Sequence, residues 1–312
     1  MKNRILITGG TGFIGSNITN MLLSKGYKVN VYDNNFRGRL KRISKKYNQQ
    51  FKFYYGDIRD KKKLKKSFNG VSKIIHLAYI NGTKYFYERP EQVLDVAVKG
   101  LVNIFDIAIS KNVKEIYLAS SSEVYQTPLK IPTSENEILK VPDIFNPRYC
   151  YGTGKILTEV YGSNFGKKYF KKMVIIRPHN VYGKDMGYDH VIPELIKKFK
   201  NIKKNKIIKI QGSGNEKRSF IHIDDFCTAF LNIMKKGKHL NIYNIGTTEI
   251  VTIKGIINEL KKIFNIKVKV IPGKLKKGGT LIRCPDIKKI KRIGFSPKIN
   301  LKSGLKKIIL ND

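Results

Sequence analysis

Cysteine is scarce in this sequence of 312 residues, and the spacing of the few present excludes two structural devices. Cys150, Cys227 and Cys284 lie far apart, and no two of them form a Cys-x-x-Cys pair. A disulfide framework or a zinc site needs closely spaced cysteines, and the histidines offer no metal-like spacing either. We therefore expect three reduced, packed thiols and no metal site.

Long apolar runs are also missing. No run approaches the ~18 residues of a membrane-spanning helix, and the first expected strand begins too close to Met1 to leave room for a secretory leader. Hydrophobic residues still make up 41% of the chain, which is enough for a core. These features predict a globular cytoplasmic protein of one large or two closely packed domains, with no membrane partner.

Acidic residues are few. The chain has 23 Asp and Glu but 62 Lys and Arg, which gives a net charge of +39. Clustered cations bind phosphate backbones, but these lysines are dispersed in short runs such as Lys61-Lys62-Lys63, between apolar positions of expected helices. No RNA-recognition or zinc-finger signature accompanies them. We predict solvated helix faces and no specific nucleic-acid partner.

Glycine is concentrated directly behind the first apolar run. The segment Thr8-Gly9-Gly10-Thr11-Gly12-Phe13-Ile14-Gly15-Ser16 follows Arg4-Ile5-Leu6-Ile7 and opens an amphipathic stretch. Such a turn brings backbone N–H groups and the positive end of a helix against a pyrophosphate. The motif predicts a dinucleotide site whose cofactor-binding residues are Gly9, Gly12, Phe13, Ile14 and Gly15.

Asp33 ends the second expected strand, where its carboxylate can accept hydrogen bonds from the adenosine ribose and would repel a 2′-phosphate. This favours NAD over NADP, although three arginines follow closely and could meet a phosphate: Arg37, Arg39 and Arg42. Asp57 follows the third strand, and we expect it to touch adenine. The strand ends complete the predicted cofactor set with Asn34, Ile58, Leu77 and Ala78.

Short apolar runs alternate with longer amphipathic stretches along the first half of the chain. This pattern predicts an α/β fold with a Rossmann-type doubly wound parallel sheet. The expected strands cover 4–8, 28–32, 51–55, 73–77, 115–120, 173–177 and 241–245. Helices are expected after Gly12, Asp60, Pro90 and Tyr151, over 224–235 and from Thr252. We assign 1–176 and about 219–248 to the NAD-binding domain, and about 177–218 and 249–312 to a smaller α/β C-terminal lobe that binds substrate.

Tyr151 and Lys155 stand four residues apart in Tyr151-Gly152-Thr153-Gly154-Lys155, on one face of an expected helix. An ammonium and an oxidised nicotinamide both favour phenolate, so Lys155 should lower the pKa of Tyr151 toward the range useful for a general base. The two glycines in the same turn cost roughly 1 kcal/mol each of helix stability. Two residues that disfavour a helix, placed inside one of its turns, indicate that a ligand approaches the helix closely there.

Over nearly its whole length the sequence resembles the extended short-chain dehydrogenase/reductases, in particular the NAD-dependent nucleotide-sugar epimerase/dehydratase group with its uronate decarboxylase-like members. The resemblance rests on the glycine motif, Asp33, the segment Ser120-Ser121-Ser122-Glu123-Val124-Tyr125 and the Tyr151/Lys155 pair. It implies a tightly held NAD, a small C-terminal lobe that grips a nucleotide diphosphate, and a homodimer packed through helices that include the Tyr151 helix.

The same resemblance implies a role for each matching residue. Tyr151 corresponds to the catalytic base, Lys155 to its pKa-lowering and ribose-binding partner, and Ser121 to the hydroxyl that hydrogen-bonds the reacting sugar oxygen. Ser121 also follows the fifth expected strand, whose carboxyl end faces the ligand crevice of such a sheet. The segments 177–183 and 218–225 resemble nucleotide-sugar contacts, and the candidates for binding the diphosphate are Asn180, Arg218 and Arg283.

Oxidation at C4 of a sugar gives a keto-sugar that can react further in three ways. It can be re-reduced from the other face, eliminate water across C5 and C6, or lose CO₂ from a C6 carboxylate. Glu123, beside Ser122, could take or return a proton at C5, and the pairing of Ser122-Glu123 with Arg283 most resembles uronate decarboxylases. We therefore expect a lyase, either a 4,6-dehydratase or a uronate decarboxylase, with an NDP-sugar 4-epimerase as the alternative.

An alternative from another class is a non-catalytic Rossmann-fold protein that binds polyanions, whose affinity for them would fall steeply as the salt concentration rises.

Two residues depart from the family pattern. Gln126 stands where Gly is usual, and Tyr79 stands where a small residue is commoner. Both are expected close to the cofactor and the sugar. They leave the oxidation step intact, but they leave the identity of the sugar open.

Overall fold

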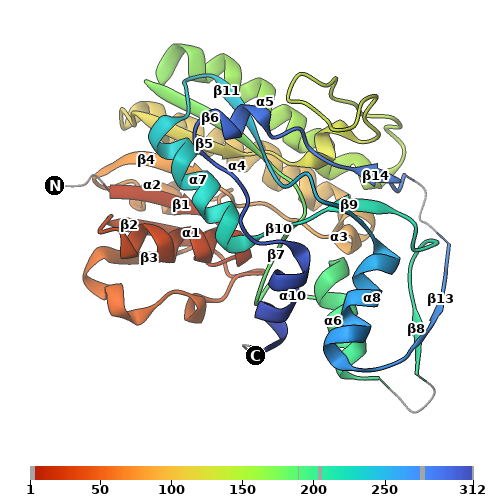
Figure 1. The fold of residues 1–312 in the computed structure, drawn as a ribbon. Helices are drawn as coiled ribbons and strands as arrows, with labels where there is room; N and C mark the ends of the chain where they lie inside the picture. Colours follow the sequence, from red (N-terminus) through yellow and green to blue (C-terminus); the bar gives the residue numbers. More distant parts are fainter. Residues whose placement is uncertain (1–3, 189, 203–205, 275–277, 311–312) are drawn as a thin grey trace.

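The computed structural model describes residues 4–188, 190–202, 206–274 and 278–310. Its centre is a seven-stranded sheet with the order β11-β6-β5-β4-β1-β2-β3 (Figure 1). All neighbouring strands in it run parallel. The strands are β1 (Arg4–Thr8), β2 (Val29–Asp33), β3 (Phe51–Tyr55), β4 (Val71–His76), β5 (Glu115–Ala119), β6 (Lys172–Pro178) and β11 (Asn241–Ile245). The strand order reverses between β1 and β4, which is where open sheets of this kind bind ligands.

The hydrophobic core has two layers, one on each face of the central sheet, and the side chains of β1 point alternately into them. Ile5 and Ile7 pack on one face of the sheet, and Leu6 packs on the other, because successive side chains of a strand point in opposite directions. Two helices cover the first face: α1 (Phe13–Ser24) and α7 (Ile223–Lys236). Three helices cover the second: α2 (Lys61–Lys66), α4 (Pro90–Ser110) and α5 (Cys150–Tyr169). The sheet is thereby buried on both sides.

A third hydrophobic cluster holds together a smaller lobe, which lies at the lower right of Figure 1. Its helices are α6 (Val191–Lys200), α8 (Ile253–Phe264) and α10 (Leu301–Leu310). Short strands accompany them: β7 (Val181–Tyr182), β8 (Ile207–Lys209), β9 (Lys217–Ser219), β10 (Ile221–His222), β12 (Ile250–Thr252), β13 (Lys269–Ile271) and β14 (Ile282–Arg283). The division of the chain into two domains at the residues given above stays a prediction.

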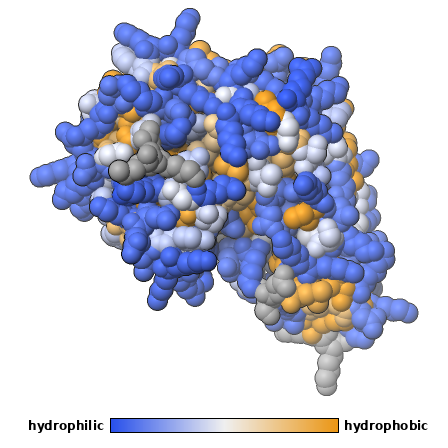
Figure 2. Space-filling view, turned by 60° about the vertical axis from the view of Figure 1, so that its left-hand side comes forward, coloured by the Kyte–Doolittle hydropathy of each residue, from blue (hydrophilic) through white to orange (hydrophobic). Residues whose placement is uncertain are grey.

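The remaining elements are short connections. They are α3 (Thr83–Glu88), α9 (Lys288–Lys291) and the 3₁₀ turns η1 (Leu40–Arg42), η2 (Lys45–Gln50), η3 (Ser122–Tyr125) and η4 (Pro147–Tyr149). Within the described ranges, no helix is both long and apolar enough to cross a bilayer, and no cluster of three potential metal-ligating side chains occurs. The three cysteines are free and buried, as expected. Hydrophilic residues cover most of the face in Figure 2, in line with the dispersed lysines.

The predicted α/β class is confirmed, and the predicted strand bounds differ from the observed ones by at most two residues. The largest difference is in β4, which begins at Val71 instead of Lys73. Its pairing with β1 continues across an irregularity between Arg4 and Ile5, so that Arg4 lies opposite Val71.

Candidate active site

A cavity of about 370 Å³ lies at the carboxyl ends of the central strands. The residues that follow β1, β3 and β4 line it, together with the ends of β2, β5 and β6. Among the predicted site residues, the following line this cavity: Gly9, Gly12, Phe13, Ile14, Gly15, Asp33, Asn34, Asp57, Ile58, Leu77, Ala78, Ser121, Ser122, Glu123, Tyr151, Lys155, Asn180 and Arg283. Arg218 lies outside the lining.

The glycine turn fits the pyrophosphate of NAD. Gly9 has a φ of 73°, and a Cβ there would lie 2.7 Å from the backbone nitrogen of Ala78. A Cβ on Gly12 would instead meet only the Gly9 carbonyl, at 3.3 Å, so this glycine faces the cavity. Because α1 begins at the next residue, its free N–H groups and dipole point toward that space.

Asp33 is held in place by backbone donors at the end of β2. Its carboxylate accepts hydrogen bonds from the N–H of Thr11 at 3.0 Å and from the N–H of Asn35 at 2.8 Å. A carboxylate has about four acceptor positions, so these bonds leave capacity for ribose hydroxyls. The orientation is consistent with the predicted preference for NAD.

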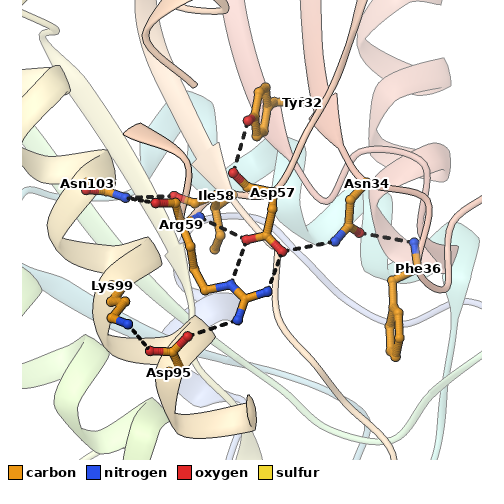
Figure 3. A network of polar contacts seen from close by, with 9 residues as sticks. All are labelled: Tyr32, Asn34, Phe36, Asp57, Ile58, Arg59, Asp95, Lys99 and Asn103. Carbon is orange, nitrogen blue, oxygen red and sulfur yellow. Dashed lines mark hydrogen bonds and ion pairs between the residues drawn. The ribbon is translucent and has the colours of Figure 1, made fainter. Parts of the chain in front are cut away.

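Asp57 lies in a polar network that sequence reasoning missed (Figure 3). Arg59 donates to the Asp57 carboxylate through Nε at 3.0 Å and Nη2 at 2.8 Å, and to Asp95 at 2.9 Å. Asn34 adds a bond to Asp57 at 3.3 Å. The hydrogen bond from Arg59 outweighs burial and lowers the pKa of Asp57. The carboxylate is thus rigidly placed at the cavity, and its contact with adenine stays a prediction.

Tyr151 lies in the first turn of α5, with only 6% of its surface exposed. Its ring stacks on Phe86 with centroids 5.0 Å apart. Burial raises the pKa of Tyr151 to about 12, although a hydrogen bond with Ser121 opposes the shift. The phenol and the Ser121 hydroxyl are thus brought together, as the resemblance implies.

Lys155 lies deeper in the same crevice, with 4% of its surface exposed. Its Nζ donates to the carbonyl of Ala119 at 2.7 Å and lies 3.8 Å from the ring centroid of Tyr79. Burial lowers the pKa of Lys155 to about 7, and the nearby Glu159 carboxylate opposes this. The expectation that Lys155 sets a low pKa for Tyr151 is therefore wrong for the protein alone. Burial dominates both groups and drives each toward its neutral form.

Glu159 follows Lys155 by one helical turn and carries a buried ion pair that the sequence analysis did not identify. Arg177 donates to its two carboxylate oxygens at 2.8 and 2.6 Å, and the Ser120 hydroxyl donates as well. Both charged side chains are almost fully buried. The pair connects α5 to the ends of β5 and β6, and thereby fixes the helix that carries Tyr151 and Lys155.

Glu123 is also paired, with Arg283 of β14. The guanidinium donates two hydrogen bonds to the carboxylate, one of them 2.8 Å long, and Arg148 lies 3.9 Å away. Burial is the largest single influence and would raise the pKa of Glu123, but the charge and hydrogen bonds of Arg283, together with the charges of Arg148 and Arg218, outweigh it and lower the pKa to about 2. So acidic a group is a weak base, which argues against the expectation that Glu123 takes a proton from C5.

The other two substrate candidates contact main-chain carbonyls. Arg218 lies opposite Arg283 in the pairing of β9 with β14, and its guanidinium donates to the carbonyls of Leu281 at 3.0 Å and Thr280 at 2.5 Å. Asn180 donates to the Ser219 carbonyl at 2.9 Å. These bonds orient both side chains near the cavity, and their contacts with a diphosphate stay predictions.

The glycines of α5 do not mark a ligand contact. A Cβ on Gly152 would lie 2.6 Å from Nε2 of Gln126, and a Cβ on Gly154 would clash with the hydroxyl of Tyr79. The expectation of close ligand approach is therefore corrected, because protein side chains fill the space that these glycines leave. Those side chains are the two that depart from the family pattern.

Comparison with known proteins agrees with this geometry. A family model described as "NAD dependent epimerase/dehydratase family" matches residues 5–246. A Methanocaldococcus jannaschii protein provisionally named UDP-glucose 4-epimerase is 32% identical over 310 residues, which cover 98% of this chain and 97% of that protein. A UDP-N-acetyl-alpha-D-glucosaminuronate decarboxylase of Bacillus cytotoxicus is 29% identical, over 99% of this chain and 97% of its own.

A solved structure is similar as well. The UDP-glucose 4-epimerase of Thermotoga maritima, determined with UDP-glucose, superposes with a TM-score of 0.88 at 28% identity. The match covers 98% of this chain and 97% of that one. The similarity thus includes both the sheet and the smaller lobe.

Replacement of Lys155 by Met tests the buried charge. A fall in the pKa of Lys155 from 10.5 to about 7 costs on the order of 5 kcal/mol of folding free energy at low pH. This penalty is complete below about pH 7 and is lost as the pH rises toward the unfolded value. We expect the NAD-free Lys155→Met variant to melt at a higher temperature than wild type at about pH 6, and the difference to shrink by about pH 9.

Thermal unfolding by circular dichroism at both pH values measures this difference. Lys167→Met, at an exposed position near the end of the same helix, is the matched control and should show no such pH dependence. A difference between Lys155→Met and wild type that stays constant with pH would contradict the account.

Proposed function

The chain belongs to the NAD-dependent epimerase/dehydratase family, and on that premise we propose that it oxidises a nucleotide-linked hexuronate at C4 and then releases its carboxylate as CO₂. When bound, NAD supplies the hydride acceptor for the oxidation. The observation that carries the proposal is the arrangement of Tyr151 and Ser121 at the cavity, beside a cationic cluster around Glu123.

Tyr151 and Ser121 handle the C4 hydroxyl. The phenolate oxygen of Tyr151 accepts the hydroxyl proton, and the hydroxyl of Ser121 hydrogen-bonds the same sugar oxygen. Because burial keeps the free phenol protonated near neutral pH, the step depends on cationic charge close to the ring. Arg37 acts in this direction, and Lys155, whose Nζ lies 5.7 Å from the ring centroid of Tyr151, adds positive charge when it is protonated.

The charges around Glu123 favour an acidic sugar. Three arginines act on this single carboxylate: Arg148, Arg218 and Arg283. Three guanidiniums against one carboxylate leave two positive charges, which suit the diphosphate, and the planar guanidinium groups can also form paired hydrogen bonds with a C6 carboxylate.

The state of Glu123 also separates decarboxylation from dehydration. Elimination of water across C5 and C6 begins with removal of the C5 proton, and a carboxylate with a pKa of about 2 is poorly suited to accept it. Decarboxylation of a 4-keto-uronate removes no such proton. The C5–C6 bond breaks, its electron pair moves toward the C4 carbonyl, and C5 is protonated afterwards.

Epimerisation at C4 is the second candidate. It needs the same oxidation, followed by re-reduction from the other face, and no group that acts on C5. The names of the Methanocaldococcus and Thermotoga relatives support it. The two reactions differ in the mass of the product.

Incubation with UDP-glucuronate and with UDP-, GDP- and dTDP-linked hexoses, followed by mass spectrometry, tests the proposal. We expect UDP-glucuronate to lose CO₂. The Arg283→Met variant should release CO₂ at least about 100-fold more slowly, because it lacks a cation for the substrate and leaves Glu123 buried without its partner. Arg292→Met, an exposed arginine outside the cavity lining, is the matched control and should leave the rate unchanged. Loss of water from a hexose, or a product of unchanged mass, would reject decarboxylation.

We further propose that the protein forms a homodimer through α4 and α5. These two helices pack against each other and expose apolar side chains at helical spacing: Leu94 and Val98 on α4, and Leu157 and Val160 on α5. An exposed apolar strip across two adjacent helices suits an isologous four-helix contact.

Light scattering after gel filtration measures the mass in solution. We expect a dimer for wild type and a monomer for the Val98→Asp/Val160→Asp variant, because the contact would bury four unpaired carboxylates. Val191→Asp, at a similarly exposed position on α6, should stay dimeric. A monomeric wild type would contradict the proposal.

A further inference from the structure

Tyr79 provides the aromatic surface on which the ammonium of Lys155 lies. The residue follows β4 by three positions and lines the cavity. Nζ of Lys155 is 3.8 Å from its ring centroid, and its edge-on contact with Tyr151 brings those centroids to 5.2 Å at 86°. We propose that Tyr79 is a positioning residue, whose ring face holds the charged end of Lys155 beside Tyr151.

The ammonium needs such a partner. It has three N–H donors, and in the described part of the chain Nζ makes one hydrogen bond, to Ala119. Glu159 supplies opposite charge, but its carboxylate is already shared by Arg177 and Ser120. The negative face of an aromatic ring attracts a cation most strongly where water is excluded. Tyr79 meets that condition, because the ammonium is buried.

The hydroxyl of Tyr79 does not explain its position. This oxygen is buried and has no hydrogen-bond partner among the described residues. A buried hydroxyl without a partner is destabilising. The ring, with its contacts to Lys155 and Tyr151, is therefore the part of the side chain that the site uses.

The helix is adapted to this ring. A Cβ on Gly154 would clash with the Tyr79 hydroxyl and would lie 2.9 Å from Cβ of Ala97. A glycine inside a helix costs roughly 1 kcal/mol relative to alanine. Helix α5 carries that cost at Gly154, and the space gained is occupied by Tyr79. The bulky loop residue and the small helix residue thus form one fitted pair.

Four titratable groups lie close to Lys155, whose pKa is set mainly by burial and raised by one of them, Glu159. Tyr79 and Tyr151 are neutral phenols near neutral pH, since burial raises the pKa of each. His76 is neutral as well, because burial lowers its pKa to about 3. Glu159 is the anion among the four, held by Arg177. A change in the ring at position 79 should therefore appear directly in the titration of Lys155.

The first test does not depend on the proposed function, because it uses the NAD-free protein and no substrate. NMR of the lysine side chains, with Lys155→Met to assign the signal, measures the pKa of Lys155. We expect a value of about 7 in wild type, little change in Tyr79→Phe, and a titration about one pH unit lower in Tyr79→Leu. An unchanged titration in Tyr79→Leu would overturn the proposal.

The second test rests on the proposed function and separates the ring's charge distribution from its shape. Mono-, di- and trifluorinated phenylalanine at position 79 keep the ring but progressively weaken its negative face. We expect kcat to fall stepwise along the series, by about tenfold in total, with its acid limb shifted to higher pH. If kcat fell in Tyr79→Leu but stayed constant along the fluorinated series, the ring would act by packing alone, and the proposal would be rejected.

Discussion

A lysine ammonium enclosed in the protein is the constraint on which the rest of the site depends. Charge in a poorly solvated place is tolerated only with nearby partners, and Lys155 has three: the Ala119 carbonyl, the Tyr79 ring and the Glu159 carboxylate. Each partner comes from a different segment, namely the end of β5, the loop after β4 and the next turn of α5. The position of the ammonium is thus fixed by the fold as a whole.

The acidic groups of the site are restrained in the same way. Glu159 is bound by Arg177, and Glu123 is bound by Arg283, and the low pKa of Glu123 makes that carboxylate a poor proton acceptor. The phenol of Tyr151 and the amine of Lys155 are left as groups whose protonation can change during a reaction. The high pKa of the phenol in the protein alone means that it is a poor base until more positive charge lies close to the ring.

The sequence was sufficient to predict those parts of the site whose residues lie close together along the chain. The glycine turn, Asp33 at the end of β2 and the i,i+4 pair of Tyr151 and Lys155 are short-range patterns, and the structure brings all of them to one cavity. Contacts between distant segments, such as those of Glu159 with Arg177 and of Gly154 with Tyr79, left no periodic signal. The direction of the pKa shift of Tyr151 was also missed, because it depends on burial that only the packed structure reveals.

The central claim is that Tyr151 removes a proton from a sugar alcohol while NAD is reduced. The most direct measurement mixes NAD-loaded protein rapidly with UDP-glucuronate and follows the absorbance of the reduced nicotinamide in a single turnover. The account predicts a transient signal in wild type, and in Tyr151→Phe a rate lower by on the order of a thousandfold with NAD still bound. A wild-type rate in Tyr151→Phe, or no transient in wild type, would contradict it.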